Sequence, residues 1–292
     1  MQPDFSPEID PATEIGTVRL TVSDLGRSRT FYERVLGLRG TESDGGAVAL
    51  GADGERPLVE LEGNSSAPRL DRSATGLFHL AILMPTRLDL GFALARLVAA
   101  RWPLDGASDH LVSEALYLSD PDGNGIEVYH DRPREEWRQT EGQLEMATLP
   151  LDLQSIAGEL KRANGAQPSM PAETRIGHVH LQVSELEQTE AFYRGVVGFE
   201  VMVRRYPGAL FVSAGGYHHH VGLNTWHSAG GAPAAPDAVG LRSFEVLLPG
   251  AAELDLVVAR IAVAGLPTAP WPAGDGWLIT DPSGNTILLR SR

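Results

Sequence analysis

The chain contains an internal duplication that covers most of its length. The segment IGTVRLTVSDL at 15–25 recurs as IGHVHLQVSEL at 176–186, so that matched residues lie 161 positions apart. A weaker similarity relates 76–127 to 240–288. Because a repeated unit dictates the architecture of a whole molecule, the 292 residues are described first as four related modules.

The pattern within one module predicts its secondary structure. Apolar residues alternate over 18–22, which is typical of a half-buried strand. Ser23-Asp24 supplies a capping start for a helix, and Gly37 supplies its end. Two shorter apolar segments, at 47–50 and 58–61, are separated by Asp-Gly and Gly-Gly turn signals. Each module is therefore predicted to have the order β-α-β-β-β.

A long connection separates the two halves of the duplication. It contains a predicted helix at 151–163 and a proline-rich stretch at 167–171. Domain boundaries fall in segments of this kind. The predicted divisions are an N-terminal domain with modules one and two (1–133), a helical and proline-rich connection (134–174), and a C-terminal domain with modules three and four (175–292).

Composition excludes several classes of function. The chain has 24 Lys and Arg against 38 Asp and Glu, a formal net charge of −14, and no basic cluster for nucleic acid. It has no cysteine, so any metal must be held by its nine histidines or by carboxylates. The acidic N-terminus differs from a signal peptide, and no apolar run reaches the ~18–20 residues of a membrane span. A cytoplasmic protein without membrane contact is predicted.

The modules resemble a known superfamily. The β-α-β-β-β order, the Phe-Tyr pair in each predicted helix and the DPDGNGIE strand at 120–127 are similar to the vicinal oxygen chelate superfamily, which includes glyoxalases, bleomycin-resistance proteins and extradiol dioxygenases. The resemblance covers almost the whole chain and implies an α+β fold in which four βαβββ modules form two cup-shaped barrel domains. The segments ASDHLVSEALY at 107–117 and GGYHHHVGLNTW at 215–226 further resemble four-module catechol 2,3-dioxygenases.

In this superfamily, metal ligands project inward from the first and last strands of the modules. The residues at the first-strand position are Thr17, His79, His178 and Ser243. The residues at the last-strand position are Glu60, Glu127, a histidine of the 218–220 triple and Leu288. In the triple, strand alternation places His218 and His220 on one face and His219 on the other.

The ligand set depends on how the modules pair, and two arrangements stay open. If modules two and three face each other, His79, Glu127, His178 and His220 form one metal site, and the other cup has lost its ligands. If the modules pair in chain order, His180 and Glu245 replace His79 and Glu127 in a C-terminal site. We prefer the first arrangement because it gathers the candidate ligands in one cup.

The resemblance also implies candidate catalytic residues. His110 lies in a DHLVS stretch that matches the Asp-His-x-x-Ser segment of extradiol enzymes, where the histidine hydrogen-bonds the substrate or the oxygen intermediate. Tyr129, beside Glu127 on the same predicted strand, is a candidate donor. Tyr117 and the two Phe-Tyr pairs are interpreted as packing residues, and the DPDGN segment as a turn.

The predicted function is a metal-dependent extradiol ring-cleaving dioxygenase. Its partners would be a catechol-type aromatic diol and O2, its metal Fe(II), with Mn, Zn or Ni as alternatives, and superfamily habit suggests a homodimer. A shared fold does not decide the reaction. A glyoxalase-type metal-dependent isomerase or lyase therefore remains an alternative, as does a metal-free protein that binds an aromatic or drug-like ligand.

Overall fold

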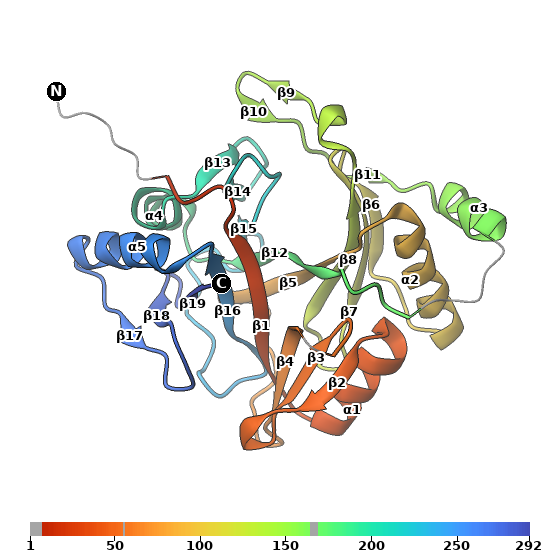
Figure 1. Ribbon diagram of the computed structural model, residues 1–292, viewed down its shortest axis with the longest axis horizontal. Coiled ribbons are helices and arrows are strands. Elements are labelled where there is room, and N and C mark those ends of the chain that lie inside the picture. The colour runs from red at the N-terminus through yellow and green to blue at the C-terminus, as the bar shows by residue number, and fades with distance from the viewer. Residues whose placement is uncertain (1–7, 55, 164–168) are drawn as a thin grey trace.

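Two curved sheets form the centre of the molecule, and the helices lie around their outer sides (Figure 1). The computed structural model describes residues 8–54, 56–163 and 169–292. No helix in this described part of the chain is long and apolar enough to cross a membrane.

Each repeat folds as the predicted β-α-β-β-β unit. Module one comprises β1 (Glu14–Val22), α1 (Leu25–Phe31), β2 (Arg39–Glu42), β3 (Val48–Gly51) and β4 (Pro57–Gly63). Module two comprises β5 (Gly76–Leu83), α2 (Arg87–Ala100), β6 (Gly106–Asp109), β7 (Ser113–Ser119) and β8 (Gly125–Asp131). Module three comprises β12 (Arg175–Gln182), α4 (Leu186–Phe192), β13 (Glu200–Val203), β14 (Ala209–Ser213) and β15 (Val221–Asn224). Module four comprises β16 (Gly240–Leu248), α5 (Ala251–Val263), β17 (Ala269–Pro270), β18 (Trp277–Thr280) and β19 (Thr286–Ser291).

The connection between the halves has secondary structure of its own. It contains β9 (Gln139–Thr140), β10 (Gln143–Leu144), β11 (Leu149–Pro150) and α3 (Leu153–Ala163). The last of these confirms the helix predicted at 151–163. Of the proline-rich stretch predicted at 167–171, residues 167 and 168 lie outside the described residues.

Local sequence explains the opening elements of a module. The alternation in β1 leaves Val18, Leu20 and Val22 completely buried. Asp24 caps α1 by accepting the backbone N–H of Arg27 at 2.9 Å. A short π-helical turn then continues α1 and ends at Gly37, whose φ of 90° is readily adopted only by glycine.

The sheets pair modules across the two halves of the sequence. The eight-stranded sheet has the order β17-β18-β19-β16-β1-β4-β3-β2, so it combines modules four and one. The nine-stranded sheet has the order β11-β6-β7-β8-β5-β12-β15-β14-β13, so it combines modules two and three. Antiparallel pairs join β1 to β16 and β5 to β12. The preferred pairing of modules two and three is confirmed, and the pairing in chain order is wrong. The first strand of each module pairs with the first strand of a module from the other half.

Contacts outside the sheets hold the modules of each half together. Tyr32, which follows α1, donates its hydroxyl to Asp120 in the DPDGN turn of module two at 3.3 Å. Tyr193 and Asp281 repeat this bond at 3.1 Å in the other half. In Figure 1, α1 and α2 accordingly lie together on the right, and α4 and α5 on the left. The boundaries predicted at 133 and 174 separate the repeats in the sequence, whereas each sheet takes strands from both of them.

Removing either tyrosine hydroxyl should destabilise the protein. In Tyr32→Phe and Tyr193→Phe, a buried carboxyl group loses one of its donors, which costs about 1 kcal/mol in the free energy of unfolding. The two bonds lie in different halves, so the double variant should lose about 2 kcal/mol. Urea denaturation measures the losses. Tyr206→Phe is the control, since its hydroxyl bonds Thr148 at an exposed position, and an equal loss there would contradict the prediction.

Candidate metal centre

Three buried side chains meet inside the cup formed by modules two and three. His79 projects from β5, Glu127 from β8 and His178 from β12. The Nε2 atoms of His79 and His178 lie 3.0 and 3.2 Å from Oε2 of Glu127. All three residues are at most 6% exposed.

Strand geometry explains why these residues meet. In the parallel pair of β5 and β8, Glu127 lies opposite Ala81, two residues from His79 and therefore on the same face. In the antiparallel pair of β5 and β12, His180 lies opposite His79 and His178 lies opposite Ala81. All four polar side chains consequently point into one cup.

The donor set fits a divalent metal ion. A buried carboxylate is costly unless it is paired or bound to a metal. Nε2 of His79 lies near that carboxylate but has no aligned hydrogen-bond partner among the residues that the structure describes. The donor atoms of His79, Glu127 and His178 all lie within 4.8 Å of one another, which is close enough for the three side chains to hold one ion. Two imidazoles and one carboxylate are also the ligand set of non-haem Fe(II) oxygenases.

The protonation states favour metal binding at neutral pH. Burial, reinforced by His79 and His218, lowers the pKa of His178 to about 4, so its imidazole is neutral. Burial alone would raise the pKa of Glu127, but His178 and His79 hold that pKa well below its usual value. A neutral imidazole and an ionised carboxylate are the forms that coordinate a metal.

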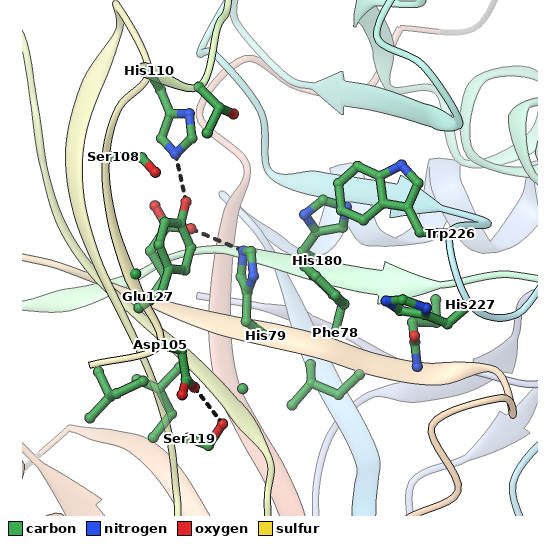
Figure 2. Close-up of a pocket in the computed structure, with 18 of the residues that line it drawn as sticks. Phe78, His79, Asp105, Ser108, His110, Ser119, Glu127, His180, Trp226 and His227 are labelled. Atoms are coloured by element: carbon green, nitrogen blue, oxygen red, sulfur yellow. Dashed lines mark hydrogen bonds and ion pairs between the residues drawn. The ribbon is translucent and has the colours of Figure 1, made fainter. Parts of the chain in front are cut away.

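A cavity of about 660 Å³ opens beside this group (Figure 2). His79 and Glu127 contribute to one side of its lining. On the other side His180 is surrounded by Phe78, Trp226 and Phe211, whose ring centroids lie 5.2, 5.4 and 5.6 Å from that of His180. These rings provide flat apolar surfaces against which an aromatic ligand can pack.

His110 and Tyr117 form a hydrogen-bonded pair in the cavity wall. Nδ1 of His110 lies 2.6 Å from the carbonyl oxygen of Ala147, which can only accept, so this nitrogen carries a proton. In the neutral ring, Nε2 then accepts the hydroxyl of Tyr117 at 2.6 Å. Burial and the charge of Glu127 raise the pKa of Tyr117 well above its usual value. Tyr117, predicted to be a packing residue, thus presents its polar atom to the site.

The turn that carries His110 is anchored on both sides. Leu111 has φ of 69°, a left-handed conformation that is uncommon for a non-glycine residue. Oδ1 of Asp109 accepts the N–H of Leu111 at 2.9 Å, and its other oxygen pairs with Arg132 at 2.7 Å. The connection after module two completes the wall, because Met146, Ala147 and Thr148 also line the cavity.

The structure does not bring Tyr129 and His220 to the cavity side of the metal group. The ring of Tyr129 contacts that of His178, with 4.9 Å between the ring centroids, but its hydroxyl bonds that of Tyr217 at 2.6 Å. Nδ1 of His220 accepts from the hydroxyl of Ser213 at 2.9 Å and from the N–H of Ala214 at 3.1 Å. Neither residue lines the cavity beside His79 and Glu127.

The histidine triple differs from the predicted strand because β15 begins only at Val221. Gly215 and Gly216 have φ of 57° and 64°, so the chain before the strand turns and alternation does not apply. His219 lines the cavity instead of His220. The three consecutive histidines indicated this region in the sequence. The prediction that alternation places His220 in the site was wrong, because this segment is not part of the strand.

A chain of hydrogen bonds fixes the orientation of His219. Nε2 of His218 lies 2.9 Å from Oδ1 of Asp131 and therefore donates to this carboxylate. In the neutral ring, Nδ1 of His218 then accepts from Nδ1 of His219 at 2.8 Å. Nε2 of His219 is left as a buried lone pair that no group among the described residues hydrogen-bonds.

A second group of nitrogens comes from His178, His218 and His219. It shares His178 with the first group, and the other two members are already bonded to each other. The first group includes a carboxylate and faces the cavity, so it is the better candidate for a metal centre.

The cup of modules one and four contains guanidinium groups beside its buried carboxylate, whereas the cup of modules two and three contains imidazoles. Glu245 accepts from Arg19 at 2.9 Å and from Arg290 at 3.2 Å, and both guanidinium groups lie over Trp271. Glu245 therefore belongs to a buried ion-pair network in the sheet of modules one and four. The expectation that it joins His180 in a metal site is wrong, because the two residues lie in different sheets.

Comparisons with known proteins agree with the fold. The family model "Glyoxalase/Bleomycin resistance protein/Dioxygenase superfamily" matches residues 14–128 and 175–289. Catechol-2,3-dioxygenase of Bacillus subtilis (strain 168) is 49% identical over 257 residues, covering 87% of this chain and 89% of that protein.

Solved structures share the architecture at low sequence identity. A putative dioxygenase from Bacillus subtilis subsp. subtilis str. 168 superposes with a TM-score of 0.66 at 14% identity, covering 97% of this chain and 86% of that one. Glyoxalase I of Zea mays gives a TM-score of 0.54 at 16% identity, covering 95% and 92%. With two matched family domains, paired sheets and a relative at 49% identity, the chain belongs to the glyoxalase/bleomycin resistance/dioxygenase superfamily.

Proposed function

We propose that this protein is a metal-dependent extradiol dioxygenase that cleaves a catechol-type aromatic diol with O2. The observation that carries the proposal is the buried group of His79, Glu127 and His178 beside an aromatic-lined cavity of about 660 Å³. The relative named catechol-2,3-dioxygenase, 49% identical to this chain, supports the same reaction.

His79, Glu127 and His178 would hold the metal, for which Fe(II) is the preferred candidate. When bound, a divalent ion of this kind supplies Lewis acidity and open coordination positions for the two diol oxygens and O2. Two neutral imidazoles and one carboxylate would leave it a net charge of about +1, which suits an anionic catecholate.

The surrounding residues bind the ring and handle protons. Phe78 and Trp226, which both line the cavity, present ring faces to an aromatic substrate. His110 keeps its proton on Nδ1 and receives the Tyr117 hydroxyl at Nε2, so this pair can hold or move a proton at the cavity wall. Nε2 of His219, which has no hydrogen-bond partner in the part of the chain that the structure describes, offers an acceptor for a substrate hydroxyl.

One position in the cup favours this reaction over the glyoxalase-type alternative. That alternative uses four ligands, including carboxylates. The strand register makes Gly222 the counterpart of Glu127, since His180 lies opposite Gly222 in module three as Ala81 lies opposite Glu127 in module two. A Cβ at Gly222 would lie only 2.9 Å from the His180 ring. At this position module three has glycine and no carboxylate, which leaves His79, Glu127 and His178 as the proposed protein ligands.

Metal binding should depend on the cup of modules two and three. We expect His79→Ala and Glu127→Gln to lower the iron content at least tenfold after anaerobic reconstitution with Fe(II), because each removes one of three donors. Ser243→Ala, at the matching position of the other cup, should keep the full content. Metal quantification gives the answer, and unchanged iron in both ligand variants would exclude this centre.

Activity should depend on His110 without loss of the metal. His110→Gln should lower kcat for catechol about 100-fold, because the ring that exchanges a proton at the cavity wall is removed. Oxygen uptake and the yellow ring-opened product report turnover, and iron content is measured in parallel. His130→Gln is the control, since His130 does not line the cavity. Two results together would favour the isomerase or lyase instead. The wild type would bind Zn or Ni firmly, and it would show no oxygen uptake after treatment with Fe(II).

The metal-free protein should lose stability as the pH falls from about 6.5 to about 4. The folded-state pKa of His178 is lowered to about 4, so in this range the unfolded chain binds a proton that the folded chain does not. The stabilisation is complete above the unfolded pKa and decreases on acidification, by about 3 kcal/mol for this residue alone. Urea denaturation in the presence of a chelator measures the slope. A free energy of unfolding that stays constant from pH 7.5 to pH 4.5 would contradict the prediction.

A further inference from the structure

A second cavity, of about 500 Å³, lies where the start of β1 meets module three. Its lining comes from 11–15, 131–137, 175–177 and 214–220, together with Arg292. It contains none of the three proposed metal ligands, although Gly177 precedes one of them. Nothing in the proposed dioxygenase reaction requires this cavity.

The charge of this cavity is opposite to that of the whole protein. Four arginines line it, Arg132, Arg134, Arg175 and Arg292, against two carboxylates, those of Glu14 and Asp131. The chain as a whole has a net charge of −14. A local excess of positive charge in an acidic protein attracts anions to one place on its surface.

Existing ion pairs occupy only part of this positive charge. Arg132 pairs with Asp109 at 2.7 Å, and Arg292 pairs with Glu14 at 3.1 Å. The negative charge of Asp131 is engaged by donors from Tyr217 at 3.0 Å and His218 at 2.9 Å. Both carboxylates in the lining therefore already have partners, Glu14 in an ion pair and Asp131 in hydrogen bonds.

Two arginine side chains keep donors available. Arg134 bonds the carbonyl oxygen of Gly215 at 2.8 Å and lies over the ring of Trp137, but it has no carboxylate partner among the described residues. The side chain of Arg175 makes no hydrogen bond or ion pair with any residue that the structure describes. A guanidinium group presents its donors as a planar fork that matches the oxygens of a carboxylate or phosphate.

A buried hydroxyl in the same lining also has no partner. Thr13 is 2% exposed, and its Oγ1 makes no hydrogen bond among the described residues. An unsatisfied buried hydroxyl costs about 1–3 kcal/mol, so such a group in a cavity wall indicates a missing partner. Because Arg134 and Arg175 supply positive charge in the same cavity, an oxyanion is the partner that fits all three groups.

We propose that this cavity binds a small oxyanion, a carboxylate or a phosphate, between Arg134 and Arg175 with the hydroxyl of Thr13 as a further donor. Trp137 and Tyr217 also line the cavity, so an organic group attached to the anion would meet aromatic side chains there. This site is separate from the diol cavity, and its occupation does not depend on the proposed reaction.

Calorimetric titration of the metal-loaded protein tests the site, with inorganic phosphate and succinate as separate probes at constant ionic strength. We expect saturable binding of at least one probe, and Arg134→Gln and Arg175→Gln should each weaken it about tenfold by removing charged donors. Arg34→Gln is the matched control, since Arg34 is exposed and lies outside the cavity. Binding of phosphate alone identifies a phosphoryl ligand, and binding of succinate alone identifies a carboxylate.

Thr13→Val separates binding from folding. It should weaken the bound probe severalfold, yet leave the urea midpoint of the anion-free protein unchanged or higher, because the hydroxyl has no partner to lose. No saturable binding of either probe to the wild type would overturn the proposal. So would equal affinities in the wild type and both arginine variants. Iron content and oxygen uptake are measured separately, so a failure here is distinguishable from a failure of the dioxygenase proposal.

Discussion

The antiparallel pairing of β5 with β12 is the constraint on which the metal centre depends. It joins the first strand of module two to the first strand of module three, although these strands lie far apart in the sequence. Only this register places His178 beside His79 and within 3.2 Å of Glu127. Side-chain alternation then sends all of these groups into the same cup.

The two cups solve the problem of buried charge in different ways. In one, Glu127 lies between His79 and His178, and burial keeps the His178 imidazole neutral, so an external cation would best complete the surroundings of the carboxylate. In the other, Arg19 and Arg290 supply the positive charge to Glu245 from within the chain. A duplicated scaffold thus retains one centre suited to a metal and one closed by internal ion pairs, because a buried carboxylate needs a cation in either case.

Contacts of two kinds bind the four modules into one structure. Hydrogen bonds such as that of Tyr32 with Asp120 hold neighbouring modules in the sequence together, whereas the sheets join modules from different halves. The connection between the halves also contributes to the site, since the carbonyl oxygen of Ala147 fixes the tautomer of His110. The cavity wall therefore depends on three separate parts of the chain.

The sequence by itself determined the repeated β-α-β-β-β unit and the helix ends, because local periodicity, capping and the repeat determine them. His79, Glu127, His178 and His110 became candidates for the site through short motifs that resemble those of a known superfamily. Only the tertiary structure decided that modules two and three share a cup, since two edge strands with similar patterns can pair in either way. It also decided that His219, not His220, lines the cavity and that Tyr129 bonds Tyr217 instead of facing it. The turn at Gly215 and Gly216 breaks the alternation there, and side-chain hydrogen bonds between distant segments leave no periodic signal in a sequence.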